Sequence, residues 1–97
     1  MKQIAKYQIH DTFRITGRGI VFVGFILDGE FGTGDIIKFD FNGQILERKI
    51  KGIDNGMRVT EGYPNVGVMI ENKSDQEIED LRNWNPDKVT GEIYSIK

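Results

Sequence analysis

Few side chains in this sequence suit catalysis or metal binding. The chain of 97 residues has no cysteine and one histidine, His10. This composition rules out cysteine nucleophiles, disulfides, thiolate metal sites and multi-histidine metal sites. His10 is the single candidate for proton transfer near neutral pH, and the sequence offers no nucleophile and base that could form a triad. We therefore expect a protein that is not an enzyme and that carries no metal and no cofactor.

One stretch fits two different patterns. Asn72-Lys73-Ser74-Asp75 has the Asn-Lys-x-Asp order of guanine recognition. The overlapping run from Ser74 to Glu77 fits a capping box, in which the two side chains satisfy backbone N–H groups at the start of a helix. The chain contains no phosphate loop with a Gly-Lys-Ser/Thr ending. We therefore interpret the stretch as a helix cap and expect no GTP.

Basic and aromatic side chains offer another chemistry, because cations and stacking rings together bind single-stranded nucleic acid. The net charge is -2, with 13 Lys and Arg against 15 Asp and Glu, so bulk charge does not attract phosphate. A local basic face is one interpretation, and ordinary salt-bridged strand faces over a core are the other. The candidate cations are Arg14, Arg18, Arg48, Lys49, Lys51 and Arg58, and the candidate rings are Phe22, Phe25, Tyr63 and Trp84.

Short strands are predicted to position these residues. Residues 13–27 read as an apolar strand, a Gly17-Arg18-Gly19 turn and a second apolar strand, and Asn42-Gly43 predicts a type I′ turn between strands 36–41 and 44–50. Further strands are predicted at 4–9, 57–59, 66–70 and 92–96, a loop with turns at 28–35, a turn at 54–56, and one helix at about 75–83. These elements predict one domain, residues 1–97, that is mainly β: a small antiparallel barrel with one short helix near the C-terminus.

The order of glycines and apolar residues matches one family. The matching residues are Phe13-x-Ile15-x-Gly17-Arg18-Gly19-x-Val21-x-x-Gly24, then Gly29 and Gly34-Asp35, and later Asn65-Val66-Gly67-Val68. This order, over about residues 9–96, resembles the second domain of translational GTPases such as elongation factor Tu. The resemblance implies a Greek-key β-barrel, which in the aminoacyl-tRNA carriers helps to hold the aminoacylated 3′ end.

The resemblance also implies a binding site. The pocket for the terminal adenosine would lie near Ile15, Val21, Asp54 and Met69, with Arg18 on the same face. His10 stands where the carriers place a glutamate, so it joins the candidate RNA-binding residues as a departure from the family's pattern. The expected partner is a tRNA end, another RNA end or a translation component.

The strand at residues 20–27 is apolar on both faces. Ile20, Phe22, Gly24 and Ile26 are predicted to fill the barrel interior, because successive side chains alternate between faces. Val23, Phe25 and Leu27 then point outward, where the carriers have polar residues, and something must cover them. One cover is this chain itself, through its terminal strands or through Trp84 and the helix. The other is a partner, which makes a protein–protein interaction module or a homodimer the alternative function.

The N-terminal residues 1–7 lack the apolar core of a secretory signal, and no stretch approaches a membrane span. We therefore expect a soluble, cytoplasmic protein without a membrane partner.

Overall fold

The computed structural model describes residues 1–54, 58–60 and 65–96. Within these residues the elements in chain order are β1 (Lys2–Ile15), β2 (Gly19–Gly32), β3 (Ile36–Phe41), β4 (Gln44–Ile53), β5 (Arg58–Thr60), β6 (Val66–Ile70), α1 (Asp75–Arg82) and β7 (Val89–Ser95). No helix in this part of the chain is long and apolar enough to cross a membrane.

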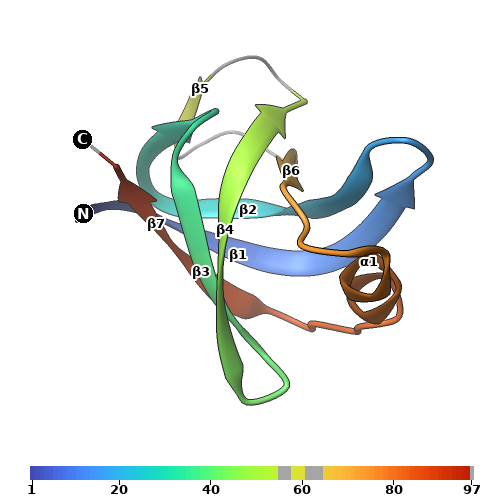
Figure 1. Cartoon of the computed structure of the whole chain (residues 1–97). Helices are drawn as coiled ribbons and strands as arrows, with labels where there is room; N and C mark the ends of the chain where they lie inside the picture. Colours follow the sequence, from blue (N-terminus) through green and yellow to red (C-terminus); the bar gives the residue numbers. More distant parts are fainter. Residues whose placement is uncertain (55–57, 61–64, 97) are drawn as a thin grey trace.

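Six of the strands form a closed barrel (Figure 1). Their order is β1-β7-β3-β4-β6-β2, and the ring closes because β2 folds back along most of β1. Every pairing is antiparallel. The short β5 adds to the end of β2, with Phe31 opposite Val59. Closure satisfies backbone groups that an open sheet would leave at its edges. The predicted mainly β fold, an antiparallel barrel with one short helix, is confirmed.

Alternate side chains of β2 build much of the core. Ile20, Phe22 and Ile26 are buried, as predicted, and Gly24 lies between them. The Trp84 ring, just after α1, packs edge-on against Phe22 and stacks on Phe39. Burial of these large apolar groups is the main favourable term for a barrel of this size. The other large side chains in the core are Tyr7, Ile9, Phe31, Ile37, Ile50, Ile70, Leu81 and Ile93.

The predicted Asn42-Gly43 turn and the predicted helix start are present. Asn42 and Gly43 have φ of 52° and 92°, and a type I′ turn needs positive φ at both positions. At the start of α1 the Ser74 hydroxyl accepts a hydrogen bond from the Glu77 N–H at 3.1 Å. The reciprocal half of the capping box differs from the prediction, because the Glu77 carboxylate accepts from the N–H of Lys73 instead of that of Ser74.

Two predicted segments were wrong. Residues 4–15, predicted as two strands, belong to the single strand β1, and most of the predicted loop at 28–35 belongs to β2, which continues to Gly32. The physical reason is visible at Gly29, where φ is 80° and an added Cβ would lie 2.1 Å from the carbonyl oxygen of Ile4. This glycine permits close contact between strands. Of the predicted turn at 54–56, Asp54 is a turn residue, and the rest lies outside the described residues, as does Met57.

Candidate functional site

A groove of about 520 Å³ lies on the outside of the barrel, next to the turn between β1 and β2. Neighbouring strands form its floor, since Val21 of β2 pairs with Met69 of β6, and Met69 in turn pairs with Gly52 of β4. We refer to it as the Arg18 groove. Its lining residues are Ile15, Arg18, Val21, Lys51, Gly52, Ile53, Asp54, Gly67 and Met69.

The Arg18 groove collects five of the six candidate RNA-binding residues. Ile15, Arg18, Val21, Asp54 and Met69 come from three strands, the β1–β2 turn and the end of β4, and all five line the same groove. Residues up to 54 positions apart in the sequence are therefore brought together by the pairing of β2 with β6 and of β6 with β4.

Sequence reasoning missed part of the groove. The predicted strand ended at Ile50, whereas β4 continues to Ile53 through a register shift between Ile50 and Gly52. This shift adds the exposed Lys51 and the half-buried Ile53 to the lining. Lys51 was a candidate cation, but nothing in the local pattern showed that it shares a surface with Arg18.

The groove has a cationic side, an apolar floor and a carboxylate. Arg18 and Lys51 are exposed, and the Lys51 ammonium donates a hydrogen bond to the Arg18 carbonyl, which ties β4 to the β1–β2 turn. Val21 and Met69 are half-buried and give the floor apolar surface. Asp54 is exposed and supplies a negative charge. A ligand with an anionic group, an apolar body and hydroxyl donors would complement this arrangement.

Asp54 is held against β6. Its backbone N–H donates to the carbonyl oxygen of Gly67 at 3.1 Å. Its carboxylate lies so close to the same residue that a Cβ on Gly67 would come within 2.6 Å of Oδ2. A side chain at position 67 would therefore push the carboxylate out of its place. Because Gly67 has no side chain, the Asp54 carboxylate stays in place as an exposed hydrogen-bond acceptor, and the backbone that carries it is fixed to β6.

A buried tyrosine supports β6 behind this groove. The Tyr7 hydroxyl donates to the carbonyl oxygen of Val66 at 2.6 Å, and the side chain is fully buried. Burial raises the pKa of Tyr7, and the negative charge of Asp54 raises it further. The hydroxyl therefore stays protonated and keeps its role as a donor to the residue that precedes Gly67.

His10 lies apart from the Arg18 groove. Its Nε2 is 2.9 Å from Oε1 of Gln8, and its half-buried ring meets the Phe25 ring edge-on, with centroids 4.7 Å apart. It sits at the register shift between Ile9 and Asp11 of β1. His10 is thus placed with the candidate partner residues and does not line the groove with the other RNA-binding candidates.

The candidate partner residues Val23, Phe25 and Leu27 point outward from β2, and we refer to them as the outer patch. Val23 is half-buried, whereas Phe25 and Leu27 are 40% and 45% exposed. Trp84 instead packs with Phe22 and the other core rings. The interpretation that Trp84 and the helix cover this face is therefore wrong for Phe25 and Leu27.

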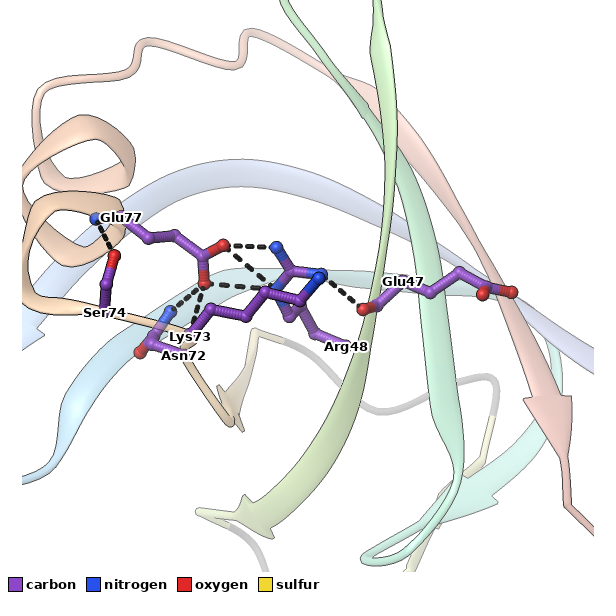
Figure 2. Close-up of polar contacts among 6 residues, drawn as sticks. All are labelled: Glu47, Arg48, Asn72, Lys73, Ser74 and Glu77. Atoms are coloured by element: carbon purple, nitrogen blue, oxygen red, sulfur yellow. Dashed lines mark hydrogen bonds and ion pairs between the residues drawn. The ribbon is translucent and has the colours of Figure 1, made fainter.

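Arg48, another candidate cation, forms a structural cluster at the start of α1 (Figure 2). Its Nε lies 3.1 and 3.0 Å from the two carboxylate oxygens of Glu77, its Nη2 also bonds Glu77, and its Nη1 donates to the carbonyl oxygen of Glu47 at 2.6 Å. Burial by itself would raise the pKa of Glu77. Hydrogen bonds from Arg48, Asn72 and the Lys73 N–H, together with the charge of Arg48, hold that pKa below its ordinary value.

This cluster also explains the Asn-Lys-x-Asp pattern. The Asn72 side chain donates to Glu77 through Nδ2 and accepts from the backbone N–H of Ile20 through Oδ1. It therefore links the helix start to β2. Ile20 pairs with Arg14 of β1, but among the described residues no residue of β6 pairs with it on the opposite side, and Asn72 bonds its N–H there. Of the remaining nucleic-acid candidates, Lys49 is exposed, Phe22 is core, only the backbone of Arg58 is described, and Tyr63 lies outside the described residues.

Comparison of the sequence with protein-family models gives no matching model, and comparison with curated proteins gives no matching sequence. The chemistry of the Arg18 groove and of the outer patch is therefore the basis for assigning a function to this chain.

Proposed function

We propose that this chain is a non-catalytic binding module that holds the 3′ end of an RNA in the Arg18 groove. The observation that carries the proposal is that one groove collects Arg18 with Ile15, Val21, Asp54 and Met69, the four residues that the resemblance to the second domain of elongation factor Tu selects. The proposal includes that resemblance: a stand-alone Greek-key barrel of that type, working in the cytoplasm with a tRNA end, another RNA end or a translation component.

The chemistry of a terminal nucleotide fits the groove in three parts. Arg18 and Lys51 supply cationic donors for phosphate oxygens. Val21, Ile53 and Met69 supply apolar surface for the base and sugar. The volume of about 520 Å³ lies within the range of pockets that hold small ligands.

Asp54 is the residue that should make the groove prefer the 3′ end of an RNA over an internal nucleotide. A terminal ribose carries free 2′ and 3′ hydroxyls, and both are donors that a carboxylate can accept. A nucleotide inside an RNA strand has lost the 3′ hydroxyl to the next phosphate. A 3′-phosphate would place like charge beside Asp54, which is unfavourable. The groove should therefore prefer a free 3′ hydroxyl.

The test is a fluorescence-anisotropy titration with short RNAs that share a sequence and end in a 3′ hydroxyl, a 3′-phosphate or a 3′-deoxyribose. Deacylated and aminoacylated tRNA are added as further ligands, at low and at moderate salt. We expect saturable binding that is tightest for a free 3′ hydroxyl and that weakens as salt increases. An acylated end keeps one hydroxyl donor for Asp54 and should bind more tightly than a 3′-phosphate. Absence of binding at low salt would overturn the proposal.

Matched variants locate the binding. Arg18→Ala should weaken binding and reduce the salt slope by about 0.7, the value for one lost phosphate contact on a single strand. Lys6→Ala is the control, because it removes one exposed cation from β1 outside the groove. Equal losses for the two variants would show that binding depends on general charge and would exclude the Arg18 groove.

The exposure of Phe25 and Leu27 favours a second candidate function, contact with a protein, including a second copy of this chain. Association through the outer patch should be insensitive to salt and should be lost in Phe25→Asp. The control is Ile45→Asp, which changes an apolar side chain that is 64% exposed on the β3–β4 hairpin. Sedimentation velocity over a range of protein concentrations distinguishes the two variants. A wild-type chain that stays monomeric at high concentration would exclude the homodimer.

A further inference from the structure

A second hollow lies beside the end of β1, near the Arg18 groove. Its volume is about 460 Å³. Residues from the last part of β1 meet the last turn of α1 there, although they are far apart in the sequence. We refer to it as the Arg82 hollow. Its lining residues are Thr12, Phe13, Arg14, Thr16 and Arg82.

The Arg82 hollow has an excess of positive charge. Arg14 Nη1 is 2.9 Å from Oε1 of Glu79, and Arg82 Nη1 is 3.3 Å from the same oxygen. Two guanidinium groups thus share one carboxylate, which leaves one positive charge without a counterpart in the triad. Each guanidinium makes its hydrogen bonds to described residues through Nη1, so its Nε and Nη2 donors are available. A guanidinium with free donors is well suited to phosphate.

Phe13 connects the hollow to the Arg18 groove. It lines the hollow, its side chain is 51% exposed, and it is paired opposite Val21, which lines the groove. Paired residues of antiparallel strands have Cα atoms about 4.5–5.5 Å apart, a span that one nucleotide covers. An exposed aromatic ring at this point is a stacking platform for a base of any sequence.

We propose that the RNA strand runs from the Arg18 groove across Phe13 into the Arg82 hollow. Phe13 stacks on the penultimate base, and Arg14 and Arg82 bind the phosphate on the 5′ side of that nucleotide. This inference rests on the proposed function, because it assumes a terminal nucleotide in the Arg18 groove. It adds a binding subsite to which α1 contributes, and it makes Glu79 an anion that competes with the phosphate.

The experiment measures affinity as a function of ligand length. The ligands are adenosine 5′-monophosphate and the 5′-phosphorylated di- and triadenylates, which share the 3′ nucleoside. We expect affinity to rise at least about tenfold from one nucleotide to two, because one charged hydrogen-bonded phosphate contact supplies about tenfold and stacking of the base on Phe13 adds to it. The third nucleotide should add little, because the subsite holds one phosphate.

Two variants with opposite expected effects on the affinity gain test the assignment. Arg82→Ala should remove the part of the gain that comes from the phosphate contact, about tenfold, and should keep the part that comes from stacking on Phe13. It should leave the affinity for the monophosphate within about twofold of the wild type, whereas Glu79→Gln should increase the gain because the competing carboxylate is gone. Lys6→Ala is again the control for loss of one charge. Circular dichroism of each variant confirms that α1 is formed.

The outcomes separate the inference from the proposed function. If the monophosphate binds in the Arg18 groove and a second nucleotide adds no affinity, the Arg82 subsite is excluded and the proposed function stands. If the gain is present but unchanged in Arg82→Ala, the second phosphate binds elsewhere and the inference is wrong. If no adenylate of any length binds, both proposals fall.

Discussion

The single Nε–H of Arg48 on β4 is shared between the two carboxylate oxygens of Glu77 on α1, with Nε–oxygen distances of 3.1 and 3.0 Å (Figure 2). Both side chains are nearly buried, with 9% of Arg48 and 13% of Glu77 exposed. The pair joins the helix to the barrel at a point where β4 has no neighbouring strand on that side among the described residues. The same carboxylate also completes the start of the helix, through the N–H of Lys73.

The first prediction concerns the stability that this pair provides. Glu77→Gln should lower the free energy of unfolding by about 2 kcal/mol or more at neutral pH, because it leaves the Arg48 guanidinium buried without its anion. Urea denaturation measures the change, and a double-mutant cycle with Arg48→Met isolates the pairwise contribution. Asp80→Asn, an exposed carboxylate on the same helix, is the control and should change stability by about 0.5 kcal/mol or less. Equal effects of Glu77→Gln and Asp80→Asn would contradict the assignment.

The second prediction is the pH dependence of that stability. The pKa of Glu77 is lowered in the folded protein, so in acid the unfolded chain binds a proton that the folded chain does not. Stability from this group is therefore complete above the ordinary glutamate pKa of about 4.3 and is lost as the pH falls through that value toward the lower folded pKa. Urea midpoints measured from neutral to acid pH should fall more steeply for the wild type than for Glu77→Gln. Parallel curves would show that Glu77 does not contribute.

The third prediction concerns Tyr7 at alkaline pH. Its pKa is raised by burial and by Asp54, so the folded chain keeps a proton that the unfolded chain releases near pH 10. Stability should therefore decrease as the pH rises above about 10, and Tyr7→Phe should remove part of this decrease. The variant should also cost about 1–3 kcal/mol at neutral pH, since the Val66 carbonyl loses its donor. Ultraviolet absorbance of tyrosinate, followed with the folded fraction, would show whether Tyr7 ionises only on unfolding.

The fourth prediction uses two glycines that line the same groove. In Gly67→Ala the new Cβ would lie 2.6 Å from Oδ2 of Asp54, so the carboxylate must move. In Gly52→Ala the new Cβ would lie 3.8 Å from the Met69 Cβ, an ordinary contact. We expect Gly67→Ala to reduce the preference for a free 3′ hydroxyl over a 3′-phosphate about tenfold, roughly one charged hydrogen bond. Gly52→Ala should keep the preference. Loss of preference in both variants would mean that bulk in the groove, and not the position of Asp54, decides it.

Elements defined by local chemistry were predicted well from the sequence. Asn42-Gly43 adopts the positive φ values that its turn requires, and Ser74 caps α1 at the predicted residue. The alternation of β2 placed Ile20 and Phe22 in the interior. These features depend on residues within a few positions of each other, so a single sequence contains the information that determines them.

Features that depend on distant partners were missed. The sequence alone places Gly29 in a loop, since the close contact of this glycine with the backbone of Ile4 exists only after β1 and β2 pair. The contribution of Arg82 beside Arg14 depends on where α1 packs. For the groove, Ile15, Val21, Asp54 and Met69 were indicated by the resemblance, and Arg18 by its place on the same face. Ile53 was not predicted, because a register shift in β4 gives no local signal.

The six barrel strands pair in a closed ring, so no strand of the barrel is an edge strand. Lys2 at the start of β1 pairs with Ser95 at the end of β7, so the two ends of the chain lie next to each other (Figure 1). A short linker could join them without disturbing any ladder of hydrogen bonds, and new ends could be opened at the exposed Asn42-Gly43 turn. The fold is thus defined by which strands are neighbours, independently of where the peptide is cut. The strands whose residues line the Arg18 groove, β4, β6, β2 and β1, are consecutive neighbours in that ring.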